Sequence, residues 1–310
     1  MSILWQPRAS LSVLKKRARI IQTIRCFFQD LDVLEVDVPV WAEHSVSDPW
    51  LDALSVECGE QTLWLQTSPE YYMKRLLAAG SGCIYSLAKA FRADEKGRLH
   101  EPEFTMLEWY RCGLDDRQLI DELIRLINIL APDLEFQKSS YADLFQSLFQ
   151  IDVHSATAEE LELLAKSHLD IDWQDDKSGW LDLIFSHLVE PRLLKGLHVV
   201  YDYPECQAAL ARTAVNSKGQ TVARRFECFI NGVELANGYW ELSDVKEQRR
   251  RFEQDNLKRH SLAKPQQEAD PYLLAALDHG LPDCAGVALG IDRLVMALLE
   301  LDSIAEQRTF

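Results

Sequence analysis

Two stretches of this chain that otherwise follow a β-hairpin pattern carry charges that could do chemistry. The first, FRADEKGRLHEPEFTMLEWYR, spans residues 91–111. Strand alternation places the carboxylate of Glu108 in a row of otherwise core-type side chains that ends at Tyr110. On the strand before it, alternation puts Arg92 and Asp94 on a common face. An acid among core residues and a cation near the turn are the kinds of side chain that bind a charged ligand.

The second stretch, RRFECFINGVELANGYWEL, has Asn231 and Gly232 as the expected turn residues. With that turn, Glu227 is expected opposite Ala236 and diagonal to Glu234 on one strand face. Diagonal neighbours lie about 7–8 Å apart, close enough for two carboxylates to share Mg²⁺. The same spacing also fits a solvated face on which the carboxylates hold no ion.

Arg293 stands where a helix is expected to begin, in GVALGIDRLVMALLEL. A cation in the first helical turn opposes the macrodipole at a cost of up to about 1 kcal/mol. Asp292 could simply offset that cost. Alternatively, the guanidinium and the helix N-terminus could bind phosphate oxygens together. The sequence has neither a G-x-G-x-x-G after a strand nor a G-x-x-x-x-G-K-[ST], so any nucleotide phosphates would need such a site.

Length and charge restrict the class of protein. A chain of 310 residues with 47% hydrophobic content can bury a large core, as one large domain or as two smaller ones. Of these two we expect the single domain over residues 1–310. The formal net charge of −16 disfavours broad binding to a phosphate backbone, so tRNA is an unlikely partner. The basic run at 249–251 lies among acids, which indicates a solvated helix face, although a small docking patch for an acidic protein would fit it too.

Cysteine spacing and the N-terminus indicate the compartment. The seven cysteines form no C-x-x-C pair, so neither a disulfide framework nor a zinc site is expected, and we expect mostly buried, reduced thiols. The N-terminus has no apolar signal region, and no apolar run reaches the roughly 20 residues that cross a bilayer. These features predict a cytoplasmic protein that is not bound to a membrane.

Helices and hairpin strands must position these charges. Strands joined by hairpins, with helices laid against them, predict an α+β fold with a mainly antiparallel sheet. We expect a helix over 11–28, an edge strand over 34–40 that Pro39 helps to end, and a strand at TLWLQT. Ser68 is expected to cap a helix that has Pro69 at its first position. Residues 115–200 are expected to be mostly helical.

Three stretches resemble the signature motifs of class II aminoacyl-tRNA synthetases: the first helix and strand ending at Pro39, the stretch 91–111, and GVALGIDR. TSPEYYMKRL, FTMLEWY and GVELANGYWEL resemble the lysyl-tRNA synthetases, and the likeness covers nearly the whole chain. It implies the synthetase-like antiparallel sheet flanked by helices. Only a short lead precedes the first motif, where lysyl-tRNA synthetases have an anticodon-binding domain. The chain therefore most resembles a stand-alone branch that attaches (R)-β-lysine to a lysine of elongation factor P.

The resemblance implies roles for the charges. Arg92 would stabilise charge on the α-phosphate of ATP, and Arg293 would hold the γ-phosphate. Glu227 and Glu234 would hold Mg²⁺. The other positions implied near ATP are Ala93, Asp94, His100, Glu101, Phe104, Leu235 and Gly290, with Phe104 stacking on the adenine. Those implied in the amino-acid pocket, where acids suit a substrate with two ammonium groups, are Ser68, Pro69, Glu70, Glu108, Tyr110, Asn237, Tyr239, Glu241 and Ala288.

These assignments conflict with strict strand alternation. Alternation from Glu234 would place Asn237, Tyr239 and Glu241 on the opposite face, so we predict a bulge within residues 236–238.

Some positions also depart from the synthetase pattern. Ala93 and Glu101 replace asparagines, and Asp94 replaces a glutamate, which puts the nucleotide contacts there in doubt. Ala288 replaces a glycine, and its methyl group would reshape the pocket for a lysine isomer with a displaced amino group.

The chemistry implied by the resemblance is ATP-dependent. β-Lysine would form an adenylate, and the ε-amine of a lysine on elongation factor P would then attack it, without a protein nucleophile. Two alternatives remain: a relative that charges tRNA with α-lysine, and a non-catalytic regulatory protein. The first motif also implies a homodimer, with which the amphipathic helix at 11–28 is consistent.

Overall fold

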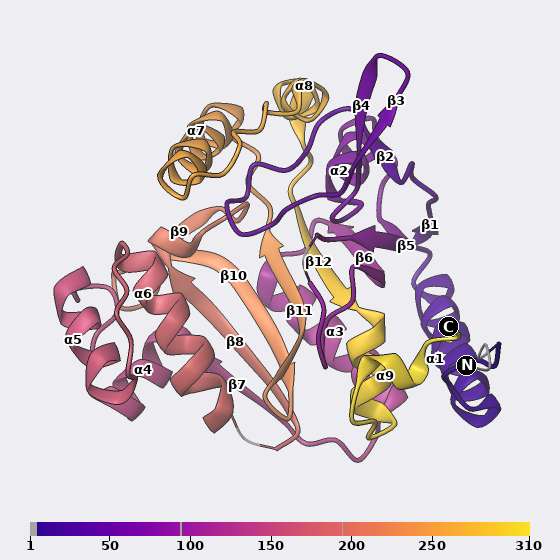
Figure 1. Ribbon diagram of the computed structural model, residues 1–310, viewed down its shortest axis with the longest axis horizontal. Helices are drawn as coiled ribbons and strands as arrows, with labels where there is room; N and C mark the ends of the chain where they lie inside the picture. The colour runs from indigo at the N-terminus through magenta and orange to yellow at the C-terminus, as the bar shows by residue number, and fades with distance from the viewer. Residues whose placement is uncertain (1–4, 94, 194) are drawn as a thin grey trace. The chain divides into compact units, whose positions relative to one another are not determined.

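The computed structural model describes residues 5–93, 95–193 and 195–310 (Figure 1). Its contacts divide the chain into two compact units, Met1–Pro132 with Leu242–Phe310, and Asp133–Glu241. We call the first the terminal unit, because it contains both chain ends, and the second the central unit. Each is described by itself, and the single domain expected over residues 1–310 stays a prediction.

The sheet of the terminal unit is built around the first predicted hairpin. Its strands are β1 (Leu34–Glu35), β5 (Ile84–Phe91), β6 (Glu103–Cys112) and β12 (Cys284–Gly290). β6 pairs antiparallel with both β5 and β12, and β1 adds a short parallel edge to β5. A separate small antiparallel sheet contains β2 (Trp41–Ala42), β4 (Gln61–Leu65) and β3 (Ser55–Cys58).

Helices close one face of the larger sheet. Tyr85 and Trp109 are direct cross-strand partners and therefore share a face. Phe28 stacks on Tyr85 with ring centroids 4.4 Å apart, and Glu122 accepts a hydrogen bond from the indole of Trp109 at 3.1 Å. Glu108, the neighbour of Trp109, consequently points to the other face. The helices described in this unit are α1 (Leu11–Asp30), α2 (Glu70–Ala78), α3 (Asp116–Leu130), α7 (Val245–Ser261), α8 (Pro271–Gly280) and α9 (Ile291–Leu298), with a 3-10 turn at Ile304–Gln307.

Helix starts in the terminal unit follow the capping signals, with one exception. Asp270 accepts hydrogen bonds from two backbone amides of α8, and Pro271 occupies the first turn. The predicted cap of α2 is wrong. Pro69 is the N-cap, and its carbonyl accepts the first helical bond, from the Met73 amide at 3.0 Å. Ser68 therefore lies outside the helix. α2 packs beside α8 (Figure 1).

The central unit consists of paired strands covered by helices. Its strands are β7 (Phe136–Ser140), β8 (Leu197–Pro204), β9 (Thr213–Val215), β10 (Thr221–Ile230) and β11 (Val233–Trp240). Its helices are α4 (Tyr141–Phe149), α5 (Ala158–His168) and α6 (Lys177–Ile184), followed by a π-helical turn at Phe185–Val189 and 3-10 turns at Glu190–Arg192 and Glu205–Gln207. β10 pairs antiparallel with β8, β9 and β11, and β7 runs parallel to β8.

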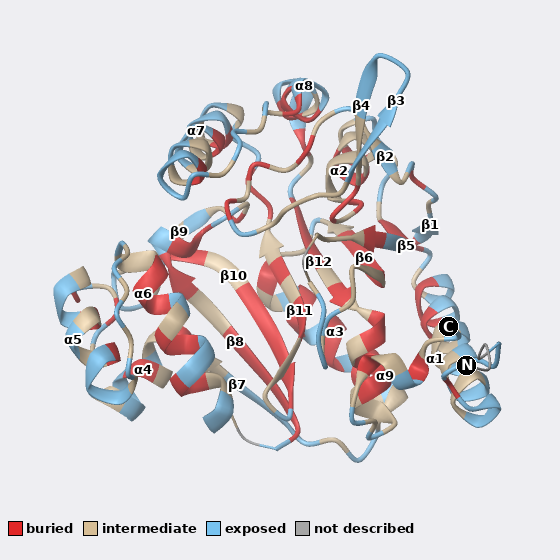
Figure 2. Cartoon of the chain, viewed as in Figure 1, coloured by how far each residue is buried: buried red, intermediate tan, exposed pale blue. Residues whose placement is uncertain are grey.

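The core of the central unit is aromatic. Tyr141 stacks on Phe145 and on Phe185, and Tyr203 and Phe229 belong to the same buried cluster. Buried residues run along β8 and β10 (Figure 2). Since Phe229 packs into this cluster, the face of β10 that contains Phe229 lies toward the helices.

The structure confirms the predicted fold class, because the strands of both units pair mainly antiparallel and are flanked by helices. The helix at 11–28 is confirmed as α1. The strand predicted over 34–40 is wrong beyond Glu35, since it lies at an edge and its proline offers no amide to a neighbour. β7 and β8 were not predicted within 115–200, although LHVVYDYP is rich in β-branched and aromatic residues.

The cysteine expectation is confirmed in part. All seven cysteines are free, but only Cys228 and Cys284 are buried, so the prediction of mostly buried thiols is wrong. Among the described residues, no helix combines the length and the apolar character needed to cross a bilayer.

Candidate active site

Arg92 follows β5 and is held by the start of β6. Its backbone amide donates to the carbonyl of Pro102 at 2.9 Å, which joins the two ends of the turn between β5 and β6. Its guanidinium lies over the ring of Phe104, 5.2 Å from the centroid, and 3.8 Å from Glu95. The Nε atom is buried without a hydrogen-bond partner in the described structure. Arg92 is thus a restrained cation with donor capacity to spare.

Arg293, in the first turn of α9, contacts the same turn. It donates to the carbonyl of Leu99 at 3.2 Å and to Nε2 of His100 at 2.6 Å. That contact makes Nε2 an acceptor, so His100 bonds in its neutral form. The neighbouring Asp292 accepts from the amide of Thr105 and from Arg17. Asp292 thus joins α9 to β6 and α1, which is more than the local charge offset considered for it.

The structure shows a local role for three of the predicted nucleotide-binding positions. Glu101 pairs with Arg308 at 3.3 Å, so this departure from the usual asparagine has a partner within the protein. Ala93 contributes a backbone amide to the carbonyl of Asp52 at 2.7 Å. Gly290 is the N-cap of α9. Asp94 lies outside the described residues.

Glu108 lies on the face of the β5, β6 and β12 sheet that is opposite Tyr85 and Trp109. It is 2% exposed, and the Tyr110 hydroxyl donates to its Oε1 atom at 2.6 Å. Its direct cross-strand partners are Ser86 on β5 and Ala288 on β12. The Ala288 methyl group therefore stands beside the carboxylate, where a glycine would leave more room.

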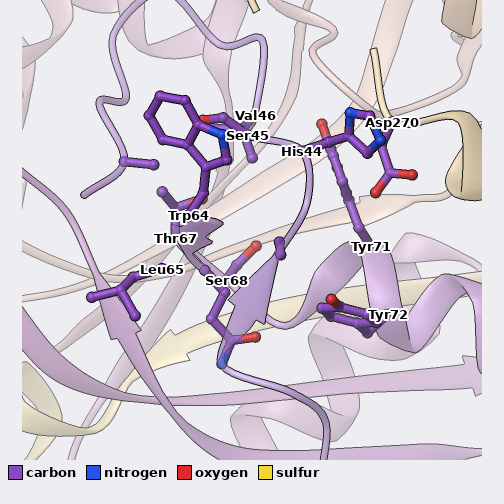
Figure 3. Close-up of a pocket in the computed structure, with 13 residues that line it drawn as sticks. His44, Ser45, Val46, Trp64, Leu65, Thr67, Ser68, Tyr71, Tyr72 and Asp270 are labelled. Atoms are coloured by element: carbon purple, nitrogen blue, oxygen red, sulfur yellow. The ribbon is translucent and has the colours of Figure 1, made fainter. Parts of the chain in front are cut away.

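Glu70 begins α2 and forms an ion pair with Lys74 at 2.6 Å. Lys74 is 2% exposed, so the protein itself provides a buried ammonium group at this acid. Ser68 lines a pocket with Trp64, Tyr71 and Asp270 (Figure 3). Its cavity volume of about 30 Å³ has room for water.

The second hairpin has the predicted turn but a different register. Asn231 and Gly232 have φ of +52° and +77°, as a two-residue type I′ turn requires. The register shifts at Leu235, so Glu227 pairs with Asn237 and not with Ala236. The bulge exists, but its predicted position at 236–238 is wrong by one residue, because the shift begins directly after Glu234.

This bulge removes the conflict with strand alternation. Phe229 pairs with Glu234, and Glu227 pairs with Asn237, so these residues share one face. Arg225 pairs with Tyr239 two positions further on. Glu241 follows β11, is 1% exposed and bridges to Ala211, while Leu235 is buried at the bulge.

Both oxygens of Glu227 have donors. Oε1 lies 2.5 Å from a guanidinium nitrogen of Arg225, and Oε2 accepts from the Tyr203 hydroxyl at 2.6 Å. Burial raises the pKa of Glu227, the Arg225 charge opposes the rise, and the nearby Glu234 carboxylate adds to it. Burial acts to lower the pKa of Arg225, but the nearby Glu227, Tyr239, Tyr203 and Asp182 together outweigh burial and raise that pKa.

The donor set of this face fits a hard cation. Glu227 and Glu234 provide carboxylate oxygens, and Asn237 adds an amide oxygen directly opposite Glu227. The Oδ1 atom of Asn237 is buried and has no hydrogen-bond partner in the described structure, as expected of an atom available to a ligand. Mg²⁺ prefers such oxygen donors. The described residues contain no group of three or more His, Cys, Asp and Glu side chains placed to hold a metal ion.

The sequence-based prediction missed Arg225, Tyr203, Lys74 and Arg308. Arg225 offered a signal, because it stands two residues before Glu227 and must share its strand face. Tyr203 and Arg308 lie far from their partners in the sequence, so no local pattern could identify them. Lys74 lies four residues after Glu70, the spacing of a helical ion pair.

Comparison with known proteins places the chain among enzymes that activate amino acids. The family model for tRNA synthetases class II (D, K and N) matches residues 3–310. The elongation factor P–(R)-β-lysine ligases of Histophilus somni and Pasteurella multocida are each 46% identical over 314 residues, covering 99% of this chain and 97% of theirs. The ligase of the same name from Photobacterium profundum is 44% identical over 320 residues, covering 100% of this chain and 98% of its own.

Proposed function

Because the chain belongs to the class II tRNA synthetases of the D, K and N group, we propose that it is an ATP-dependent ligase. Its relatives with 44–46% identity over nearly all of both chains are elongation factor P–(R)-β-lysine ligases. We infer the same reaction here: activation of (R)-β-lysine as an adenylate and transfer to the ε-amino group of a lysine on elongation factor P.

The observation that carries the proposal is the surroundings of Glu108. A buried carboxylate on this face of the sheet, oriented by Tyr110, suits an ammonium group of the substrate. Ala288, beside Glu108, replaces the glycine usual in lysyl-tRNA synthetases. Its methyl group makes the pocket narrower at this wall. This supports a lysine isomer as substrate. The other predicted pocket residues, Ser68, Pro69, Glu70, Asn237, Tyr239 and Glu241, stay assigned to the amino acid.

Arg92 and Arg293 are assigned to ATP. The spare donor capacity of Arg92 suits the α-phosphate, on which charge develops during adenylate formation. Arg293 is assigned to the γ-phosphate, with His100 fixed beside it. The guanidinium of Arg92 lies over the Phe104 ring, which supports placing the adenine near this ring, where the base can stack.

Glu227 and Glu234, with Asn237, are assigned to Mg²⁺, which when bound supplies positive charge to the phosphate oxygens. The protein contributes fixed positions and charges and no covalent nucleophile. In the first step the carboxylate of β-lysine attacks the α-phosphorus of ATP, a P–O bond forms, and pyrophosphate leaves. In the second step the ε-amine attacks the acyl carbon of the adenylate, an amide forms, AMP leaves, and the amine loses a proton.

The proposal is tested with purified protein, ATP, Mg²⁺, (R)-β-lysine and elongation factor P. Mass spectrometry is expected to show a gain of one β-lysyl residue on a single lysine, and none when that lysine is replaced by arginine. A parallel reaction with tRNA for lysine and α-lysine is expected to give no aminoacylation. Charging of the tRNA without modification of elongation factor P would overturn the proposal. The homodimer and the cytoplasmic location stay predictions.

A further inference from the structure

Arg225 is a cation built into the face assigned to Mg²⁺, and the proposed reaction gives it no task. It shares that face with Glu227, because the two residues are separated by one position on β10. The guanidinium to carboxylate distance is 2.5 Å, and the exposed fractions of the two side chains are 16% and 11%. A divalent cation would therefore meet a carboxylate that already has a positive partner.

The position of Arg225 is fixed by contacts other than Glu227. A second guanidinium nitrogen donates to the carbonyl of Gln207 at 2.9 Å, and the plane lies 4.6 Å from the centroid of the Tyr203 ring. Gln207 itself donates to Asp182 at 2.5 Å. These contacts hold the cation in place whether or not it shares Glu227 with a metal ion.

A buried ion pair of this kind contributes little net stability, because removing both charges from water is costly. Breaking such a pair, in contrast, leaves one buried charge without compensation. Without Arg225, the repulsion between Glu227 and Glu234 would act on a carboxylate that is 9% exposed. The guanidinium therefore stabilises the strand face that contains the two carboxylates when no metal ion is bound.

We propose that Arg225 is an internal counter-ion that occupies Glu227 in the metal-free protein and weakens the binding of a divalent cation at Glu227 and Glu234. This inference rests on the proposed function, because it takes the metal site from there. A carboxylate oxygen has two lone-pair directions, so a metal ion can share Glu227 with Arg225 or displace it. In either arrangement the two cations repel each other. Arg225 thus keeps the empty site folded and lowers its affinity for the metal ion.

The proposal predicts opposite changes in two properties when the charge is removed. Arg225→Gln is expected to lower the melting temperature of the metal-free protein. The same variant is expected to bind Mn²⁺, used as a probe for Mg²⁺, roughly tenfold more tightly, because a repelling charge a few ångströms from the ion is gone. Simple damage to the fold would weaken both properties, so the two signs together are diagnostic.

The experiment is a Mn²⁺ titration followed by electron paramagnetic resonance of the free ion at pH 8, with melting curves recorded without metal. Arg225→Lys retains a charge and is expected to stay within about twofold of the unmodified protein in Mn²⁺ affinity. Arg224→Gln is the matched control, since Arg224 is the next residue on the strand and its guanidinium lies over Trp240. It removes the same charge on the other face and is expected to leave the Mn²⁺ affinity unchanged.

Several results would overturn the proposal: equal or weaker Mn²⁺ binding by Arg225→Gln, the same tightening in Arg224→Gln, or no Mn²⁺ binding by any variant. Arg225→Met, which has a similar apolar stem and no charge, replaces the glutamine variant if the latter does not fold. Glu234→Gln is expected to weaken Mn²⁺ binding, which locates the bound ion. The titration needs neither amino acid nor turnover, so its failure is distinct from a failure of the unmodified protein to form an adenylate.

Discussion

Each unit contains a buried glutamate bound by a tyrosine, and the two glutamates differ in their neighbours on the strands. In the terminal unit Tyr110 donates to Glu108 at 2.6 Å, and in the central unit Tyr203 donates to Glu227 at the same distance. The cross-strand partners of Glu108 are the uncharged Ser86 and Ala288. Glu227, in contrast, shares its face with the guanidinium of Arg225.

We propose that this difference separates a substrate site from a metal site. At Glu108 we assign the compensating charge to an ammonium group of the substrate, so occupancy and chemistry are coupled. At Glu227 the protein provides a cation, so the face is stable before any ligand arrives. Glu70 follows the second pattern, since Lys74 pairs with it at 2.6 Å. The proposed role of a buried acid in this protein therefore depends on which cation lies closest to it.

Glu108→Gln is expected to have the largest effect, on catalysis. Removing the charge that meets the substrate ammonium is expected to lower kcat/KM for β-lysine activation by about 10²- to 10³-fold. Glu103→Gln is the matched control, because Glu103 begins the same strand and pairs with Lys89 at the surface. Kinetics of adenylate formation check this, and equal losses in both variants would contradict the comparison.

Glu227→Gln is expected to act on stability as well. Arg225 would remain buried without its carboxylate, so the free energy of unfolding of the metal-free protein should fall by about 3 kcal/mol. Urea denaturation measures the change. Glu247→Gln removes an exposed acid that pairs with Arg250 and Arg251 on α7, and it should cost less than about 1 kcal/mol. A loss at Glu227 as small as that at Glu247 would show that Arg225 does not need its partner.

Asp255 is a half-buried acid whose hydrogen bond comes from a hydroxyl, that of Ser47 at 2.7 Å. Burial raises the pKa of Asp255 to about 6. The folded protein therefore retains this proton more strongly than the unfolded chain, and the stability from it is lost as pH rises through about 6. Asp255→Asn is expected to raise the free energy of unfolding by about 2 kcal/mol at pH 8, and by much less at pH 4. A destabilised variant at pH 8 would contradict this account of burial.

Ala288→Gly is expected to have the smallest effect, on substrate choice. Removing one methyl group beside Glu108 should shift the ratio of kcat/KM for β-lysine and α-lysine by about tenfold toward α-lysine. Parallel activation assays with the two isomers measure the ratio. Ala285→Gly, at another β12 position whose partner is Arg111, is the control. An unchanged ratio would show that Ala288 does not determine the choice between β-lysine and α-lysine.

The sequence predicted the fold class and the local turns well, because these depend on short patterns. The turn at Asn231 and Gly232 and the helix start at Pro271 follow from residue type alone. The position of the bulge at Leu235 was missed by one residue, since alternation shows that a shift is needed but not where pairing relaxes. The charge partners at Glu227 could not be predicted in full, because Tyr203 reaches it from β8.

Pyrophosphate exchange into ATP, compared for (R)-β-lysine and α-lysine, tests the central claim most directly. The assay reports adenylate formation alone and needs neither elongation factor P nor tRNA. The account predicts exchange that depends on the amino acid, is faster with (R)-β-lysine, and is lost in Glu108→Gln. Exchange that prefers α-lysine, or no exchange with either isomer, would contradict it.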